Sequence, residues 1–257
     1  MWQCAVVQSD LPVVGDEGSG YIAFMNDRVI VALDLASEAE AIELVERLGA
    51  AASSYKVGLQ LLTAEGPSIV RWLVGQGKNV FLDLKLHEIP NSVAGAVAAA
   101  GRLGVSMVTV HASAGSAVLR AAVEAARPFP RLQVLALTVI TSIGERDLAE
   151  IGVHGSVLEQ VERLAVLAAS AGCHGVIASP QEAARLRRVL PAASLIVTPG
   201  TQLAGEAQSD HARTATPAEA IRAGATHLVV GRSIARATDP IAAFASVCSE
   251  VAEHGER

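Results

Sequence analysis

The chain has 257 residues, which fits one large domain and is too short for two comfortable ones. Apolar residues make up 51% of it and aromatic residues only 3%, so its core must be built from Ala, Val, Leu and Ile. The formal net charge is −6 and no run of Lys or Arg occurs. These features argue against nucleic acid or an anionic membrane as a partner, but a few local cations could still hold a small anion.

The three cysteines, Cys4, Cys173 and Cys248, are odd in number and far apart. Their spacing predicts neither a disulfide framework nor a metal site, and it fits a reducing, cytoplasmic environment. The N-terminus lacks the pattern of a signal peptide. The uncharged stretch 103–119 is interrupted by Gly, Ser and His, so we expect strand, loop and helix there and no membrane span.

Short apolar runs alternate along the chain with longer segments of helical pattern. The runs are nearly continuous in Val, Ile and Leu, as in strands buried on both faces. They predict eight strands, at 28–35, 54–61, 79–85, 106–112, 132–141, 174–179, 194–199 and 227–232. The helical segments predicted between and after them are 37–49, 63–77, 89–104, 115–126, 156–172, 179–190, 216–224 and 239–254.

Strict alternation of eight strands with eight helices is the pattern of a (β/α)₈ TIM barrel in the α/β class. An open, doubly wound sheet is the alternative. Residues 1–26 fall outside the alternation, so we expect an N-terminal extension that is flexible or loosely docked. Residues 27–257 would then form a single catalytic barrel domain.

Charged residues stand near the ends of the first three predicted strands, where a barrel carries its active site. They are Asp34, Lys56, Asp83 and Lys85. Asp83 and Lys85 are two residues apart, so their side chains should share a face of the strand. Inside an apolar barrel these charges must pair. They form either an internal salt-bridge layer or a substrate site in which a cation faces developing negative charge.

Two further features at strand ends have a functional and a structural interpretation. Gly231 and Arg232 follow the eighth predicted strand, where barrels commonly bind phosphate, but an arginine after a glycine turn can also be a plain surface residue. His111 ends the fourth predicted strand and is either an acid–base group or a structural histidine.

Seven segments, in this order, resemble the bacterial orotidine 5′-phosphate decarboxylases. They are VALD (31–34), YKVG (55–58), FLDLKLHEIPNSV (81–93), TVHAS (109–113), LTVITS (137–142), VTPG (197–200) and VVGRSI (229–234). The likeness covers roughly residues 28–250, and the block at 81–93 is its most specific part. Phosphosugar aldolases and epimerases share this fold, and the Ile-Pro-Asn turn after the Asp–Lys pair separates the chain from them.

The resemblance implies a lyase without cofactor or metal that acts on a pyrimidine ribonucleotide carrying a 6-carboxylate. Lys85 would protonate ring carbon 6 after CO₂ leaves, and Asp83 would lie near the departing carboxylate. Lys56 would pair with the acids and approach the ribose. The family's homodimer with shared sites implies that Glu88 acts in the partner's site.

The resemblance also implies a set of substrate-binding residues around the nucleotide. Asp34 would bind the ribose, and Gly231 with Arg232 would hold the phosphate. The other positions implied are Lys56, Ile89, Pro90, Ser92, Thr141, Pro199, Gln202 and His211.

Three positions depart from the family's pattern. Glu88 replaces the last Asp of the DxKxxD motif, and Gln202 replaces the Arg of the usual TPGIR. His211 follows Asp210 where the family usually has Gln. A protonated His211 would bind an anion, and nucleotide affinity would then fall as the pH rises from about 6 to 8.

The departures leave three functional hypotheses open. The chain is a working orotidine 5′-phosphate decarboxylase, a relative turned to a modified pyrimidine nucleotide or a nucleoside, or a catalytically weak nucleotide-binding homologue. The intact Asp83–Lys85 pair argues against the last of these.

Overall fold

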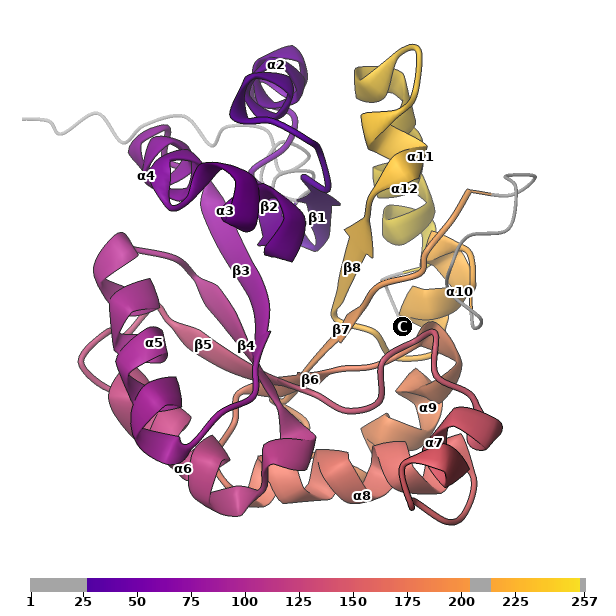
Figure 1. Ribbon diagram of the computed structural model, residues 1–257. Helices are drawn as coiled ribbons and strands as arrows, with labels where there is room; N and C mark the ends of the chain where they lie inside the picture. Colours follow the sequence, from indigo (N-terminus) through magenta and orange to yellow (C-terminus); the bar gives the residue numbers. More distant parts are fainter. Residues whose placement is uncertain (1–26, 204–213, 255–257) are drawn as a thin grey trace, which may run out of the picture.

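The computed structural model describes residues 27–203 and 214–254, and in it eight parallel strands close into a barrel (Figure 1). Each strand pairs with the next in chain order, and β8 returns to pair with β1. The strands are β1 (Val29–Ala32), β2 (Ser54–Gly58), β3 (Asn79–Leu86), β4 (Met107–His111), β5 (Gln133–Leu137), β6 (Gly175–Ile177), β7 (Leu195–Thr198) and β8 (His227–Val230). The predicted TIM barrel is confirmed, and the open doubly wound sheet is excluded.

Helices surround the barrel on the outside (Figure 1). They are α2 (Glu38–Leu48), α3 (Leu59–Glu65), α4 (Ser68–Gly75), α5 (Pro90–Leu103), the 3₁₀ turn η1 (Ala112–Ala114), α6 (Ser116–Ala126), α7 (Glu145–Glu150), α8 (Val157–Ser170), α9 (Pro180–Val189), α10 (Pro217–Arg222), α11 (Arg232–Ala235) and α12 (Pro240–His254). Hydroxyl N-caps start several of them, because a side-chain oxygen there accepts a hydrogen bond from an otherwise unpaired amide. These caps are Ser37, Ser156, Ser179 and Thr216.

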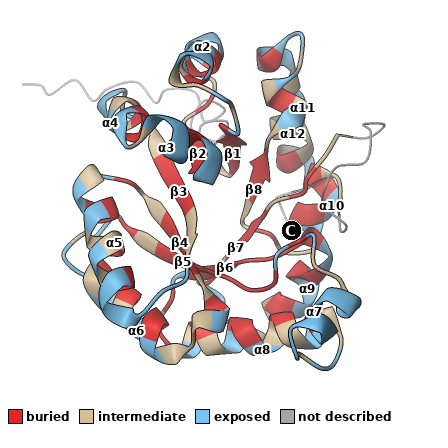
Figure 2. Ribbon diagram, viewed as in Figure 1, coloured by how far each residue is buried: buried red, intermediate tan, exposed pale blue. Residues whose placement is uncertain are grey.

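Two apolar layers hold the barrel together. The larger layer fills the space between strands and helices, so buried residues lie on the strands and on the inner sides of the helices (Figure 2). A smaller cluster lies among alternate strand residues, and its members are Ile30, Ala32, Phe81, Leu135, Leu137, Ile177, Val197 and Val229. Continuing that alternation toward the carboxyl ends of β1 and β3 gives Asp34 and Asp83, so polar side chains follow the apolar layer.

Some predicted boundaries are wrong. The second strand was expected to reach residue 61, but it ends at Gly58 and α3 begins at Leu59. The helix expected at 63–77 is divided by Gly66 and Pro67 into α3 and α4. The fifth strand ends at Leu137 instead of residue 141, and α7 was not predicted. A continuous apolar run does not distinguish a strand from a buried helix or turn, which explains why the ends of β2 and β5 were predicted too late.

The predicted extension over residues 1–26 lies outside the described residues. No helix in the part of the chain that the structure describes is long and apolar enough to cross a membrane.

Two glycines of α5 provide a test of the helix packing. A methyl group at the buried Gly101 would overlap the Phe129 ring, whereas one at the exposed Gly95 would meet nothing within 4 Å. We expect Gly101→Ala to lower the free energy of unfolding by about 1–3 kcal/mol through overpacking. Gly95→Ala should raise it by about 0.5–1 kcal/mol, because alanine is the better helix former. Urea unfolding of both variants measures the difference, and equal effects would contradict the packing described.

Candidate active site

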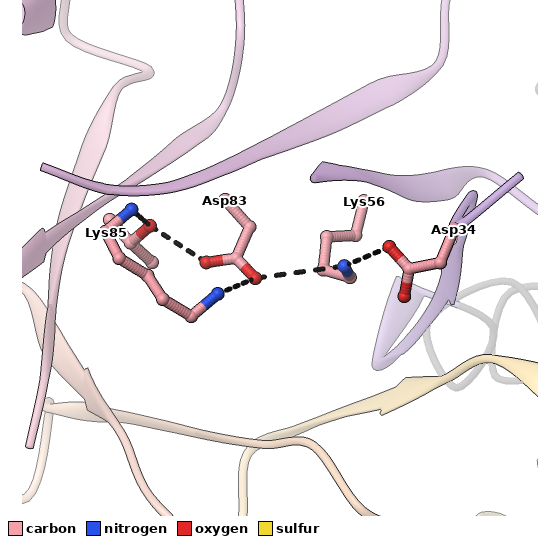
Figure 3. Close-up of polar contacts among 5 residues, drawn as sticks. Asp34, Lys56, Asp83 and Lys85 are labelled. Atoms are coloured by element: carbon pink, nitrogen blue, oxygen red, sulfur yellow. Dashed lines mark hydrogen bonds and ion pairs between the residues drawn. The ribbon is translucent and has the colours of Figure 1, made fainter. Parts of the chain in front are cut away.

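Four charged side chains form a row of alternating sign at the carboxyl ends of β1, β2 and β3 (Figure 3). Lys56 Nζ lies 2.8 Å from Asp34 Oδ1 and 3.8 Å from Asp83 Oδ2. Lys85 Nζ lies 2.7 Å from the same Asp83 oxygen. We call Asp34, Lys56, Asp83 and Lys85 the ion chain. Its formal charges cancel, as buried charges require.

Exposure changes along the ion chain. The side chains of Lys56 and Asp83 are only 10% and 11% exposed, whereas those of Lys85 and Asp34 are 32% and 54% exposed. The inner pair is therefore held in surroundings of low polarity, where charge–charge interactions are stronger than in water. The two outer groups are open to a ligand.

The backbone at Lys85 has an unusual conformation. Its φ is 50°, and it is the one non-glycine residue with positive φ in the described part of the chain. The pairing of β3 with β4 also shifts here, because Leu82 pairs with Val108 but Leu86 pairs with Val110. Three residues of β3 thus lie opposite Thr109 alone. Such irregularities often redirect a side chain beside an active site.

A cavity of about 830 Å³ opens at this end of the barrel. The whole ion chain lines it, together with five other residues that the sequence analysis proposed as substrate-binding: Thr141, Pro199, Gln202, Gly231 and Arg232. Gly231 and Arg232 lie at the start of α11 after β8. Gln202 follows β7, and its backbone amide donates to the Ala215 carbonyl. The cavity has the size of a small-molecule site.

Four of the remaining candidates, all at the start of α5, do not line this cavity. Glu88, Ile89, Pro90 and Ser92 are exposed at the start of α5. Hydrogen bonds with the Ser92 side chain and the Ile89 backbone lower the pKa of Glu88, so its carboxylate is ionised at neutral pH. His211 lies outside the described residues.

His111 does not line the cavity either, and its contacts favour the structural interpretation. Its ring stacks on that of His87 with centroids 5.1 Å apart, and its Nδ1 lies 2.6 Å from the Ser113 hydroxyl. Burial, and then the charges of His87 and Lys85, lower the pKa of His111. The ring is therefore neutral at neutral pH and adds no second cation beside Lys85.

Two residues beside the ion chain lie in segments that resemble the family, but they were not predicted as site residues. Thr109 on β4 is fully buried, and its hydroxyl donates to Asp83 Oδ1 at 2.9 Å. Gly58 ends β2 beside Asp34 and Lys56.

The number of lysines is a further signal that sequence reasoning missed. The chain has three lysines in all, Lys56, Lys78 and Lys85, and two of them are in the ion chain. Among the described residues, no group of three His, Cys, Asp or Glu is placed to hold a metal ion.

Comparison with known proteins agrees with this geometry. The model of the family "Orotidine 5′-phosphate decarboxylase / HUMPS" matches residues 27–247. The chain belongs to this family. It is 46% identical to the orotidine 5′-phosphate decarboxylase of Moorella thermoacetica over 88% of this chain and 92% of the relative. It is 48% identical to the enzyme of that name from Halorhodospira halophila, over 89% and 97% of the two chains.

A solved structure gives the same result for the fold. The crystal structure of orotidine 5′-phosphate decarboxylase from Lactobacillus acidophilus superimposes with a TM-score of 0.79 and 35% sequence identity. The match covers 88% of this chain and 99% of that one. The resemblance noted in the sequence is therefore confirmed at the level of the family and the barrel.

Gly58 provides a test of the close packing around the ion chain. A methyl group there would lie 3.0 Å from Asp34 Oδ1 and 3.1 Å from Lys56 Nζ. We expect Gly58→Ala to lower the free energy of unfolding by about 1–3 kcal/mol, because the pair must move apart. In an Asp34→Ala background the same change should cost about 1 kcal/mol less, since the nearest atom is gone.

Urea unfolding of the two single variants and the double variant measures this coupling. Gly75→Ala is the matched control, because Gly75 is exposed at the end of α4 and a methyl there meets nothing within 4 Å. Strictly additive effects of Gly58→Ala and Asp34→Ala would show that the methyl group does not act through the ion pair.

Proposed function

We propose that this protein is an orotidine 5′-phosphate decarboxylase, a cofactor-independent carboxy-lyase that forms UMP and CO₂ in pyrimidine nucleotide biosynthesis. The observation that carries the proposal is the ion chain, in which Asp83 and Lys85 meet at 2.7 Å on the wall of a ligand-sized cavity. Relatives named for this activity, 46–48% identical over most of both chains, support it.

The reaction follows from the charges of the two residues. Asp83 would face the 6-carboxylate of the substrate, and the repulsion between two carboxylates would ease as CO₂ leaves. Lys85 would stabilise the electron pair left on ring carbon 6 and then give it a proton. Lys56 lies 3.8 Å from the same Asp83 oxygen and partly offsets its charge, so the repulsion that the substrate carboxylate meets is reduced.

The phosphate would bind at the other side of the cavity, where Gly231 and Arg232 begin α11. Thr141 and Pro199 would lie beside the base, and Asp34 would bind the ribose. Binding energy from the distant phosphate can be used to hold the carboxylate against Asp83. A cytoplasmic enzyme remains our expectation.

A second candidate function is suggested by Gln202. It lines the cavity where the family usually has arginine, so one phosphate cation is replaced by a neutral amide. A substrate with less negative charge, such as a pyrimidine nucleoside carrying the same carboxylate, would fit that change. Turnover of orotidine in preference to its 5′-phosphate would favour this function.

We also propose a homodimer in which Glu88 completes the partner's site. Glu88, Ile89, Pro90 and Ser92 are exposed and outside the cavity of their own chain, as such a role requires. Ile89 is 61% exposed, and a subunit contact at this position would cover it.

Activity is tested by following the loss of the ultraviolet absorbance of orotidine 5′-phosphate. We expect the wild-type protein to turn it over and Lys85→Ala to lose at least about a thousandfold in kcat, because the acid and the cation are removed together. Lys85→Arg should be almost as poor, since a guanidinium keeps the charge but does not release its proton. An inactive wild-type protein, or an active Lys85→Ala, would contradict the proposed function.

The shared site is tested by mixing two variants, Lys85→Ala and Glu88→Ala, each expected to be nearly inactive alone. A mixed dimer holds one site with Lys85 from one chain and Glu88 from the other. Equal mixing with subunit exchange should restore about a quarter of the wild-type sites. No recovery, with exchange verified by mass spectrometry, would place Glu88 in its own chain's site.

A further inference from the structure

We propose that Thr109 is a positioning residue, which holds the Asp83 carboxylate and the Lys85 backbone in the arrangement that the reaction needs. The inference deepens the proposed function and rests on it. It starts from one hydroxyl group that contacts two neighbouring members of the ion chain, Asp83 and Lys85.

The hydroxyl of Thr109 lies between the Lys85 backbone and the Asp83 side chain. Thr109 Oγ1 accepts a hydrogen bond from the Lys85 amide at 2.8 Å and donates one to Asp83 Oδ1 at 2.9 Å. A hydroxyl has a single hydrogen, so once its lone pair accepts the amide its hydrogen is available for the carboxylate. The hydroxyl of Thr109 therefore accepts from the Lys85 amide and donates to the Asp83 carboxylate, and the chemistry of these two partners fixes both roles.

The contact with Thr109 restricts the orientation of the Asp83 carboxylate. Thr109 occupies Oδ1, and Lys85 Nζ occupies Oδ2 at 2.7 Å, with Lys56 Nζ at 3.8 Å from the same oxygen. The two oxygens therefore have different partners, and the plane of the carboxylate cannot turn without breaking one contact. Thr109 thus fixes the orientation in which one oxygen of Asp83 faces both lysines.

The same hydroxyl contacts the backbone of Lys85, which has an unusual conformation. Its φ of 50° is rarely adopted by residues other than glycine, and such a conformation persists only where surrounding contacts hold it. The regular pairing of β3 with β4 is interrupted between Leu82 and Leu86, so the usual sheet contacts are displaced at this point. The Thr109 hydroxyl supplies the acceptor that the Lys85 amide uses instead.

The burial of Thr109 distinguishes this role from direct contact with a ligand. Its exposed fraction is 0%, and it does not line the cavity. It therefore acts through Asp83 and Lys85, and its loss should change the rate of the chemical step more than substrate binding.

Thr109→Val removes the hydroxyl and keeps the shape of the side chain. We expect kcat for orotidine 5′-phosphate to fall about 100-fold with little change in KM, because the reacting groups are displaced while the phosphate end is untouched. Thr109→Ser, which keeps the hydroxyl, should restore most of the rate. If Thr109→Val does not fold, Thr109→Ala, which also removes the hydroxyl, takes its place.

The matched control is Thr138→Val. Thr138 is also buried, but its hydroxyl donates to the Ile177 carbonyl at 2.9 Å and not to a member of the ion chain. A comparable loss of thermal stability with an unchanged kcat is expected. Equal losses of kcat in Thr109→Val and Thr138→Val would mean that any buried hydroxyl matters, and would overturn the inference.

A second readout does not need activity. In protein labelled with ¹⁵N-lysine, the three lysines give three backbone amide signals, and hydrogen exchange can be followed for each. The Lys85 amide should exchange at least about tenfold faster in Thr109→Val and return toward the wild-type rate in Thr109→Ser. The Lys78 amide, which donates to the Leu73 carbonyl, is the internal standard and should not change.

The two readouts separate the possible failures. A wild-type protein that does not turn over orotidine 5′-phosphate overturns the proposed function, and amide exchange then decides whether Thr109 holds the Lys85 backbone. Unchanged exchange at Lys85, or a Thr109→Ser variant as slow in turnover as Thr109→Val, overturns the inference about Thr109.

Discussion

The Lys56 ammonium group lies between the carboxylates of Asp34 and Asp83, and this neutralisation makes the rest of the site possible. The buried Asp83 carboxylate would be costly to hold beside an apolar barrel core without it. Lys56 is itself almost buried, so its charge interacts with Asp83 in surroundings of low polarity. A neutral chain of four charges thus places the Asp83 carboxylate next to Lys85, where a carboxylated substrate is proposed to bind.

The barrel provides this arrangement through its alternation. Inner residues of the strands pack against one another, and the next alternate positions of β1 and β3 are Asp34 and Asp83. The single irregularity that matters most is at Lys85, where β3 departs from regular pairing with β4 and φ becomes positive. Strands β2 and β3 thus fix Lys56 and Asp83, and Asp34 follows the end of β1. Lys85 is placed by a local distortion that Thr109 contacts.

Much of this was predictable from the sequence. Continuous apolar runs and their regular spacing gave the barrel, and the charges near strand ends gave the ion chain, because strand ends meet at one edge of a barrel. The structure brings together nine of the proposed site residues around one cavity. The exposed positions at Glu88–Ser92 could be linked to a site only through the resemblance, since their role depends on a second chain.

Other features had no signal in the sequence. A positive φ at Lys85 is not indicated by residue type, because lysine normally avoids that region. The contacts of Thr109 could not be predicted for a related reason. They depend on the shift in pairing between β3 and β4, which appears only when the two strands come together in the fold. The end of β2 at Gly58 was missed because the apolar run continues into α3.

The central claim is that the ion chain faces the reacting carbon while the loop after β8 holds the phosphate. A crystal structure of the complex with UMP tests it most directly. We predict that Lys85 Nζ lies within about 3.5 Å of ring carbon 6, as a proton donor requires, with the phosphate on Gly231 and Arg232. A nucleotide bound with its base away from Lys85, or with its phosphate against the ion chain, would contradict the account.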